Sequence, residues 1–576
     1  MTTRSDLIRM LAELAKLTAL DEGSPQAFKV RAYENAIAGI ESHPAEPSGL
    51  TKAELTEIKG VGNSTADKIL ELEATGKVAK LDTLREIYPP AFVALTKIPG
   101  LGPKTLKMLR SQLGIEDIEG LKEAVDAERL RELPGLGEKS EQKIARAIDR
   151  LGLHGKDRRT PLVEVLGFAN SLARRIAEID GVVEAVPCGS IRRFSETIGD
   201  VDIVVATKKP SLVGDAVLAY PEVTEVVGAG ETKISFLTRE GLQVDIRTVR
   251  PDQLGSALLY FTGSKAHNIA LRQKAIDRGL LLSEYGLFED DEVVVSETEG
   301  EIYEALGMQV VPPMLREGGG EVEAALAGEL PNLVERSDIR GDLHYHSDRS
   351  GDGRSSLEEM TEAAIAAGWE YVAFTDHGED LAINGSTPGQ MLAHRDRIRD
   401  LDSRYPEIRL LFGCELNIGR DGGLDYDPDF RLEFDYCVAS IHSHFDLPSD
   451  LQTARILTAL ADPAVNAIGH LTGRYVGRRP GVELDVAVVL EALALTGVAL
   501  EINGALDRLD ATAEVARKAM SVGVDVVIDT DSHHTGDLVR MDYGVRYARR
   551  GWVTTNRVLN TRSIEQVLAW AAARRE

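Results

Sequence analysis

The chain has 576 residues, 93 acidic and 66 basic, so its formal net charge at pH 7 is −27 and its pI is near 5.0. This length predicts about four domains. This strongly negative charge argues against a broad basic surface that binds nucleic acid. Any DNA contact must therefore come from local basic or backbone-donor patches and from metal ions. The three cysteines lack Cys-x-x-Cys spacing, which argues against a disulfide framework or a zinc ribbon.

The first six residues lack the charged and then apolar pattern of a signal peptide. No uninterrupted apolar run is long enough to cross a bilayer, because the run at 486–502 is broken by Glu491 and Glu501. We therefore expect a cytoplasmic protein in a reducing compartment, with no membrane partner.

Three similar motifs recur in the first quarter of the chain. Each reads apolar-x-Gly-apolar-Gly, at 58–62, 98–102 and 133–137, and a basic helical stretch follows each one. Such glycines permit a tight hairpin whose backbone N–H groups meet a phosphate at the N-terminus of the next helix. Three copies of this helix-hairpin-helix pattern predict sequence-independent binding of DNA backbone without net positive charge. The predicted contact residues are Gly60, Gly62, Gly100, Gly102, Gly135 and Gly137.

A possible phosphate-binding turn at 189–193 precedes two carboxylates, Asp200 and Asp202. The acids alternate with apolar residues in a predicted strand at 199–206, so both side chains point to the same side. Two carboxylates in this arrangement repel each other and favour the binding of a divalent cation such as Mg²⁺. Asp245, in a second strand-like segment at 242–247, would complete a two-metal site. An Asp-x-Asp pair alone would be read as a solvated strand end, but this combination favours a nucleotidyltransferase.

Residues 1–320 resemble the family X DNA polymerases, close to DNA polymerase beta, and the match includes the spacing from Gly189 to Asp200. The resemblance implies that Asp200 and Asp202 hold Mg²⁺ or Mn²⁺, and that Asp245 activates the primer 3′-hydroxyl as base and metal ligand. The residues implied to bind the triphosphate are Gly189, Ser190, Arg193 and Arg159, since planar guanidinium groups match phosphate oxygens. An ordinary surface arginine remains the alternative for Arg159.

The segment at 260–264 resembles the sugar-facing turn of that family. The resemblance implies that Tyr260 and Phe261 lie against the deoxyribose and favour dNTP over rNTP. It also implies nucleotide contacts by Gly263, Lys265, Asn268 and Arg272, the last two lying four residues apart on one helical face. Lys265 departs from the family, where an acid is expected, so a solvated lysine is the alternative there.

The first hairpin lies in a segment that resembles the small lyase domain of the family. Lys68 occupies the position of its Schiff-base lysine, and Lys29 and Tyr33 also match. An amine with a lowered pKa can attack the aldehyde of an abasic site. Ser64 and Glu34 replace two basic residues of the family, however, so contact of Lys68 with a backbone phosphate is the alternative.

Most of the 12 histidines follow Gly341, where apolar strand-like runs alternate with amphipathic helical stretches. This alternation predicts seven strand-helix units in a closed, TIM-like barrel, with strands at 341–346, 371–375, 409–416, 434–441, 465–469, 498–502 and 524–528. Polar residues at the carboxyl ends of these strands should gather on one face. They are His344, His346, His377, Glu415, His442, His470, Asp531 and His533.

Histidine and carboxylate ligands suit Zn²⁺, Mn²⁺ or Fe²⁺, and so many ligands can hold two or three ions. His394 and His534 are predicted to be ordinary hydrogen-bonded histidines. Motifs at 342–353, 375–377 and 531–533 resemble the PHP (polymerase and histidinol phosphatase) domain family over 338–576. The resemblance adds Asp352 as a ligand and implies a three-metal site that hydrolyses phosphate esters. Arg474 would bind the substrate phosphate there.

The predicted fold is multidomain, α+β and α/β. Its expected parts are a lyase-like helical domain (1–88), a helix-hairpin-helix domain (89–152), a nucleotidyltransferase palm (153–250), a nucleotide-selecting thumb (251–317), a linker (318–337) and a (β/α)7 PHP barrel (338–576).

We expect a monomeric, nucleoid-associated DNA polymerase that binds gapped or primer-template DNA and dNTPs and fills gaps in base-excision or break repair. The barrel would process DNA ends as a 3′-to-5′ exonuclease, a 3′-phosphatase or an abasic-site nuclease. The alternatives are a DNA-tethered phosphatase and a non-catalytic repair scaffold. The two complete sets of metal ligands disfavour both.

Overall fold

The computed structural model describes residues 4–25, 27–43, 47–98, 101–138, 140–142, 144–145, 159–381 and 385–575. The chain divides into two compact units, 1–158 and 159–576, which are considered separately. Among the described residues, no helix combines the length and the apolar character needed to cross a bilayer.

The first unit is helical, and its three predicted hairpins share one local geometry. In each, the N–H of the second apolar residue donates to the carbonyl of the first over 3.0 Å: Val61 to Ile58, Leu101 to Ile98 and Leu136 to Leu133. All six residues are buried in one hydrophobic core, which anchors the hairpins. The helices are α1 (Arg4–Glu22), α2 (Phe28–Ser42), α3 (Lys52–Glu57), α4 (Asn63–Thr75), α5 (Ala79–Ile87), α6 (Pro90–Ala94), α7 (Pro103–Leu113) and α8 (Ile118–Asp126).

The second unit begins with the palm segment, residues 159–250, built on a five-stranded sheet in the order β2-β4-β7-β6-β5. Only β4 and β7 pair in parallel, and their register places Asp202 opposite Asp245. The apolar residues of β4 at 201, 203 and 205 pack in one core with α10, so the acids at 200 and 202 lie on the other face. The bounds are β1 (Thr160–Pro161), α10 (Leu162–Ala177), β2 (Val182–Pro187), α11 (Gly189–Arg192), β3 (Thr197–Ile198), β4 (Asp200–Thr207), α12 (Pro210–Leu218), β5 (Glu225–Ala229), β6 (Lys233–Leu237) and β7 (Gln243–Val249).

The thumb segment, residues 251–337, combines helices with a three-stranded antiparallel sheet in the order β10-β9-β8. The stretch expected to be a linker, 318–337, contains a packed helix, because Val322 and Ala325 belong to the thumb core. Glu321 of this helix is also buried, and its Oε1 lies 2.7 Å from Nδ1 of His267. The bounds are α13 (Leu254–Thr262), α14 (Lys265–Ile276), β8 (Leu281–Ser283), β9 (Gly286–Glu289), β10 (Glu292–Val295), α15 (Glu299–Ala305) and α16 (Glu321–Ala327).

The remaining residues, 338–575, form the barrel: seven parallel strands that neighbour one another in chain order. A bridge between Tyr345 and Ser532 links the first strand to the end of the last, so the barrel is nearly closed. This confirms the predicted (β/α)7 architecture, and the observed strands agree with the predicted ones to within two residues. They are β11 (Gly341–Tyr345), β12 (Tyr371–Phe374), β13 (Arg409–Asn417), β14 (Tyr436–Ser440), β15 (Ala467–Gly469), β16 (Ala499–Asn503) and β17 (Val526–Asp529).

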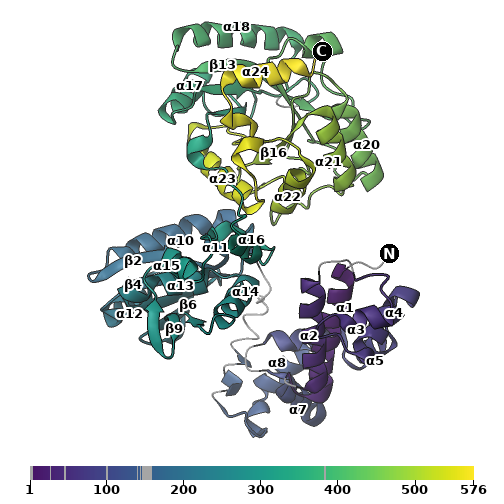
Figure 1. Ribbon diagram of the computed structural model, residues 1–576, viewed down its shortest axis with the longest axis vertical. Coiled ribbons are helices and arrows are strands. Elements are labelled where there is room, and N and C mark those ends of the chain that lie inside the picture. The colour runs from purple at the N-terminus through teal and green to yellow at the C-terminus, as the bar shows by residue number, and fades with distance from the viewer. Residues whose placement is uncertain are drawn as a thin grey trace. The chain divides into compact units, whose positions relative to one another are not determined.

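Helices lie around the strands of the barrel (Figure 1). Most connect one strand to the next, and they cover its outer surface with apolar residues such as Ile398 and Leu490. The helices are α17 (Leu357–Ala366), α18 (Pro388–Arg404), α19 (Pro428–Arg431), α20 (Ser449–Leu460), α21 (Val486–Thr496), α22 (Ala513–Val522), α23 (Arg540–Arg550) and α24 (Ile564–Ala573). The carboxyl ends of the strands are thereby left for the loops that carry the predicted metal ligands.

A shared carboxylate joins the palm to the thumb. Glu299 accepts hydrogen bonds from both terminal nitrogens of Arg192, at 2.9 and 2.7 Å, and from Nη1 of Arg316 at 2.5 Å. Its side chain is 13% exposed. Burial by itself would raise its pKa, but the two guanidinium groups outweigh burial and lower the pKa of Glu299 to about 2.

Glu299→Ala should therefore lower the free energy of unfolding by about 3 kcal/mol at pH 7, because it leaves two buried cations without their partner. The difference in free energy of unfolding between the wild type and this variant should be complete above the unfolded pKa of Glu299, 4.5, and should decline as the pH falls toward 2. Urea unfolding at pH 7, 5 and 4 measures this, with exposed Glu304→Ala as the matched control. Equal effects of the two variants at pH 7 would contradict the ion-pair account.

Candidate metal centres

The three palm acids converge. Asp200 and Asp202 come from β4 and Asp245 from β7, and one oxygen from each lies within 4.8 Å of the others. Burial, together with the neighbouring carboxylates of Asp200 and Asp245, raises the pKa of Asp202 to about 7. Burial and Asp245 likewise raise the pKa of Asp200. Because mutual repulsion of this kind is relieved by a divalent cation, the donor set fits Mg²⁺ or a similar hard ion.

The predicted phosphate-binding turn lies directly against these acids. Gly189 has φ of +57°, and a Cβ added to it would lie 2.4 Å from Oδ2 of Asp202. The N–H of Cys188 donates to the carbonyl of Asp202 over 2.7 Å, which fixes the turn to β4. Ser190 follows at the start of α11. Only glycine permits this approach at position 189.

The two predicted triphosphate arginines have protein partners in this structure. Arg193 is 14% exposed; its Nε donates to Glu317 over 2.8 Å, and its Nη1 donates to the carbonyl of Thr262 over 2.5 Å. Arg159 is exposed, and its Nε donates to Oγ1 of Thr197 over 2.8 Å. Triphosphate binding by Arg193 would therefore require an exchange of its partner Glu317.

Three of the residues implied to contact the nucleotide share a pocket in the thumb. Tyr260, Asn268 and Arg272 line it. Arg272 lies with Cζ 5.0 Å from the centre of the Tyr260 ring, and Nδ2 of Asn268 donates to the carbonyl of Tyr260 over 2.8 Å. Phe261 packs edge-on against Tyr260 at 5.0 Å. The structure thus brings the implied sugar and base contacts together.

The other two residues of this group lie at the end of one helix and the start of the next. Gly263 follows α13, and a Cβ added to it would lie 3.3 Å from Nη1 of Arg193. Lys265 is the first residue of α14 and is exposed. It does not line the pocket with Tyr260, so both interpretations of Lys265 stay open.

Sequence reasoning missed the residues that hold Asp245 in place. Nζ of Lys233 lies 2.9 Å from one carboxylate oxygen of Asp245, and Nε2 of Gln243 donates to the other over 3.2 Å. Burial raises the pKa of Asp245, but hydrogen bonds from Ser235 and Lys233 outweigh burial, so the pKa is lowered. The sequence pattern that could have revealed Lys233 and Ser235 is their alternation with apolar residues, which puts both on one face of β6.

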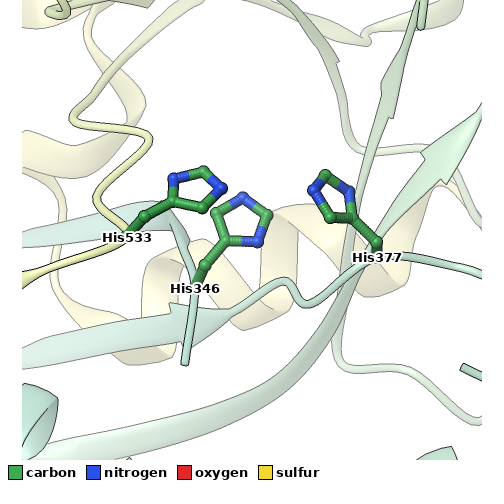
Figure 2. A group of neighbouring side chains, drawn as sticks. All are labelled: His346, His377 and His533. Atoms are coloured by element: carbon green, nitrogen blue, oxygen red, sulfur yellow. The ribbon is translucent and has the colours of Figure 1, made fainter. Parts of the chain in front are cut away.

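The nine predicted ligands of the barrel lie together at the carboxyl ends of its strands. Glu415 is central: its oxygens lie 2.9 Å from His470, 3.0 Å from His377 and 3.1 Å from His442. Figure 2 shows His346, His377 and His533, which come from three different strand ends and lie side by side. The structure brings together all of the predicted set: His344, His346, Asp352, His377, Glu415, His442, His470, Asp531 and His533.

Seven of these nine ligands form three overlapping groups in which the donor atoms lie within 4.8 Å of one another: His346, His377 and His533; His344, His346 and Asp531; and His377, Glu415 and His442. Nε2 of both His344 and His346 is buried without a hydrogen-bond partner in the described part of the chain. Buried nitrogen atoms left unpaired beside carboxylates fit bound metal ions.

A further ring of residues orients these ligands. Oε1 of Glu501 lies 2.5 Å from Nδ1 of His344, and its other oxygen accepts from the N–H of His470. Asp376 accepts from Ser347 and Ser350 and lies 2.9 Å from Nε2 of buried His394, so His394 is the hydrogen-bonded core residue that was predicted. Sequence reasoning missed Glu501, although it lies in β16, the one barrel strand without a predicted ligand.

Arg474, which was predicted to bind substrate phosphate, has protein partners in this structure. Its Nη1 and Nη2 lie 3.0 Å from the two carboxylate oxygens of Glu196 in the palm, and its remaining donors go to the carbonyls of Arg508 and Leu509. The guanidinium thus joins Glu196 of the palm to two barrel carbonyls, and phosphate binding by Arg474 would require an exchange of Glu196.

The predicted DNA-binding glycines have the expected backbone. Gly60 and Gly135 adopt φ of +91° and +84°. An added Cβ would meet nothing within 4 Å at Gly62, Gly102 or Gly137, so their backbone is accessible to a ligand. Gly100 lies outside the described residues.

Of the three predicted lyase residues, Lys68 and Tyr33 lie near each other. Nζ of Lys68 lies 2.9 Å from the carbonyl and the hydroxyl of Ser64 and 5.9 Å from the centre of the Tyr33 ring. Burial lowers the pKa of Lys68. Lys29 is exposed and pairs with Glu22 over 2.9 Å.

Comparison with known families agrees with this geometry. The chain matches the families described as helix-hairpin-helix domain over 2–78, SAM-like helix-hairpin-helix tandem over 92–150, DNA polymerase beta palm over 159–238, DNA polymerase beta thumb over 257–317 and PHP domain over 342–505. The last match ends before β17, so Asp531 and His533 are placed at the site by the structure alone.

One curated relative covers nearly the whole chain. The DNA polymerase/3′-5′ exonuclease PolX of Bacillus subtilis is 37% identical over 572 residues, 98% of this chain and 99% of the relative. Probable phosphatases of Acetivibrio thermocellus and of Thermoanaerobacter sp. are 30% and 28% identical, over 39% and 38% of this chain and 92% and 89% of their own lengths. The chain therefore belongs to the bacterial PolX family, the family X DNA polymerases with a C-terminal PHP domain.

Asp202→Asn should raise the thermal midpoint of the chelator-treated protein, because it removes one of three crowded carboxylates, a gain of about 1 kcal/mol. It should also reduce the further rise that Mg²⁺ produces in the wild type, since a ligand is lost. Thermal unfolding with and without Mg²⁺ measures both effects. Asp215→Asn, at an exposed acid of α12, is the matched control; a destabilising effect of D202N without metal would contradict the repulsion account.

Proposed function

We propose that this chain is a DNA-directed DNA polymerase that fills gaps during DNA repair, and that its barrel removes nucleotides from DNA 3′ ends. The observation that carries the proposal is the presence of two separate clusters of metal ligands in one chain: three acids beside a glycine turn in the palm, and nine ligands at the strand ends of the barrel. The name of the Bacillus subtilis relative, which joins polymerase and 3′-5′ exonuclease, supports it.

In the palm, Asp200 and Asp202 would hold Mg²⁺ or Mn²⁺. These ions would supply positive charge that stabilises the phosphoryl oxygens in the pentacoordinate transition state. Asp245 accepts the proton of the primer 3′-hydroxyl, and Lys233 keeps it ionised and in place. Ser190 and Arg193 orient the triphosphate, with Arg159 as the further cation. Tyr260 and Phe261 pack against the sugar of the dNTP. Gapped or primer-template DNA is held by the glycine hairpins of the first unit.

In the barrel, the nine ligands would hold two or three Zn²⁺, Mn²⁺ or Fe²⁺ ions, which supply an activated water and charge neutralisation for phosphodiester hydrolysis. Glu501 holds the ring of His344 in the orientation that presents Nε2 to the site. Removal of a terminal 3′-phosphate is a second candidate reaction, because the relatives that match the barrel alone are named probable phosphatases. Cleavage at abasic sites is a third.

We retain the division into domains at 1–88, 89–152, 153–250, 251–317, 318–337 and 338–576, with α16 as a structured part of the connecting segment. The protein would act as a monomer on nucleoid DNA, because each cluster of ligands is completed by residues of one chain.

Asp200→Ala should abolish primer extension on gapped DNA, by at least about a hundredfold, and leave 3′-end degradation within twofold, because only the palm loses a ligand. His344→Ala should give the reverse. Both activities are measured on 5′-labelled substrates with the full chain, and Asp215→Ala and His534→Ala serve as matched controls. Loss of both activities in either variant would contradict two independent sites, and a wild type without extension or degradation would refute the function.

Lys68→Ala should abolish the borohydride-stable crosslink between the protein and abasic DNA, because burial lowers the pKa of Lys68 and increases the fraction of free amine at neutral pH. The crosslink is measured by gel shift after reduction, with exposed Lys122→Ala as the control. If the wild type forms no crosslink but K68A weakens DNA binding, Lys68 is a phosphate contact instead.

A further inference from the structure

A row of arginine and aromatic side chains borders the barrel cluster. Its members come from three neighbouring loops, those after β14, β15 and β16, and two of these loops also carry the ligands His442 and His470. We call this set the rim row: Phe445, Tyr475, Arg479 and Arg508. All four side chains are partly exposed.

The rim row is continuous from a metal ligand outward. Nε of Arg508 lies 3.4 Å from Oδ2 of Asp531, and Cζ of Arg508 lies 4.6 Å from the centre of the Tyr475 ring. Cζ of Arg479 lies 4.7 Å from the same ring and 3.9 Å from the centre of the Phe445 ring. The two rings therefore hold two guanidinium planes at increasing distance from Asp531.

Arg479 lacks a counter-ion. Its Nε and Nη2 donate to the carbonyl of Gly473, over 3.0 and 2.6 Å, and no carboxylate of a described residue lies within 4.0 Å of it. Burial lowers the pKa of Arg479, and the nearby guanidinium of Arg508 contributes to this lowering. Two neighbouring guanidinium groups with one carboxylate, Asp531, beside Arg508 and none beside Arg479 among the described residues favour an anion with more than one phosphate.

The rim row also adjoins the palm. Tyr475 and Arg479 pair across a short hairpin whose tip is Gly477, at φ of +76°. A Cβ added to Gly477 would lie 2.6 Å from Cγ of Pro161 in β1, and the N–H of Val476 donates to the carbonyl of Asp507 over 2.7 Å. The hairpin is thus held between the palm and the loop of Arg508.

We propose that the rim row is the track that leads a single DNA strand, 3′ end first, into the barrel cluster. Arg508 contacts the phosphate to be hydrolysed, Arg479 contacts the next phosphate toward the 5′ end, and Tyr475 and Phe445 fix the two guanidinium planes. Basic grooves interleaved with aromatic rings are a general means of binding single strands without sequence preference. This inference rests on the proposed exonuclease function and names the substrate that the barrel takes.

Arg478 provides a matched control, because it is an exposed arginine next to Arg479 and its removal changes the net charge equally. Arg479→Ala should raise KM for degradation of a single-stranded oligonucleotide about tenfold, the loss of one charge-assisted contact. Hydrolysis of a chromogenic diester with only one phosphate should stay within twofold, as should primer extension. R478A should resemble the wild type in all three assays. Tyr475→Leu should raise KM as R479A does, and Tyr475→Phe should restore it.

A binding measurement separates this proposal from the proposed function. A labelled, nuclease-resistant phosphorothioate trinucleotide should bind R479A about tenfold more weakly than R478A, whether or not the barrel is active. Equal binding and equal KM of the two variants would overturn the track and leave the exonuclease function standing. A mononucleotide that binds as tightly as the trinucleotide, or displacement by an acidic peptide alone, would also overturn the track. A wild type that binds the trinucleotide through Arg479 but degrades no strand would refute the function and retain the track.

Discussion

Gathering ionisable metal ligands from different strands at one place is the constraint on which this structure depends. In the palm, the parallel register of β4 and β7 sets Asp202 opposite Asp245, and the alternation of side chains adds Asp200 on the same face. In the barrel, seven parallel strands present their carboxyl ends to one side, so ligands far apart in sequence meet around Glu415. In the palm the three carboxylates repel one another, and a bound cation would relieve that repulsion, whereas in the barrel histidines lie beside the carboxylates.

The protein also moderates these clusters with its own charges. Lys233 and Ser235 lower the pKa of Asp245 despite its burial, so one of the three palm acids stays ionised in the absence of metal. In the barrel, His442 and other histidines outweigh burial and hold the pKa of Glu415 well below its usual range. The two sites thus differ: in the palm, the neighbours Ser235 and Lys233 hold one acid ionised, and in the barrel the ligands themselves do so.

Patterns local in sequence predicted most of the fold and of both sites. Strand ends, the Asp-x-Asp spacing and the glycine hairpins depend on a few neighbouring residues, and the structure places them as expected. What could not be predicted depends on packing between distant segments. Arg474 meets Glu196 across 278 residues, and nothing near either one indicates the other. Glu501 lies in an apolar run, and its contact with His344 follows only from the closure of the barrel.

Contacts between residues far apart in the sequence also hold the palm segment around Arg193 and Glu196 against the barrel. Glu196 stands in the chain between Arg193 and Asp200, two of the predicted palm residues, and the barrel holds it through Arg474. Arg550 of the barrel donates to Glu317 over 2.6 Å and to the carbonyl of Arg193 over 3.0 Å, while Arg193 donates to the same oxygen of Glu317. The palm residue Arg193 and the barrel residue Arg550 therefore share one carboxylate oxygen of the thumb, so the three parts of the second unit meet at Glu317.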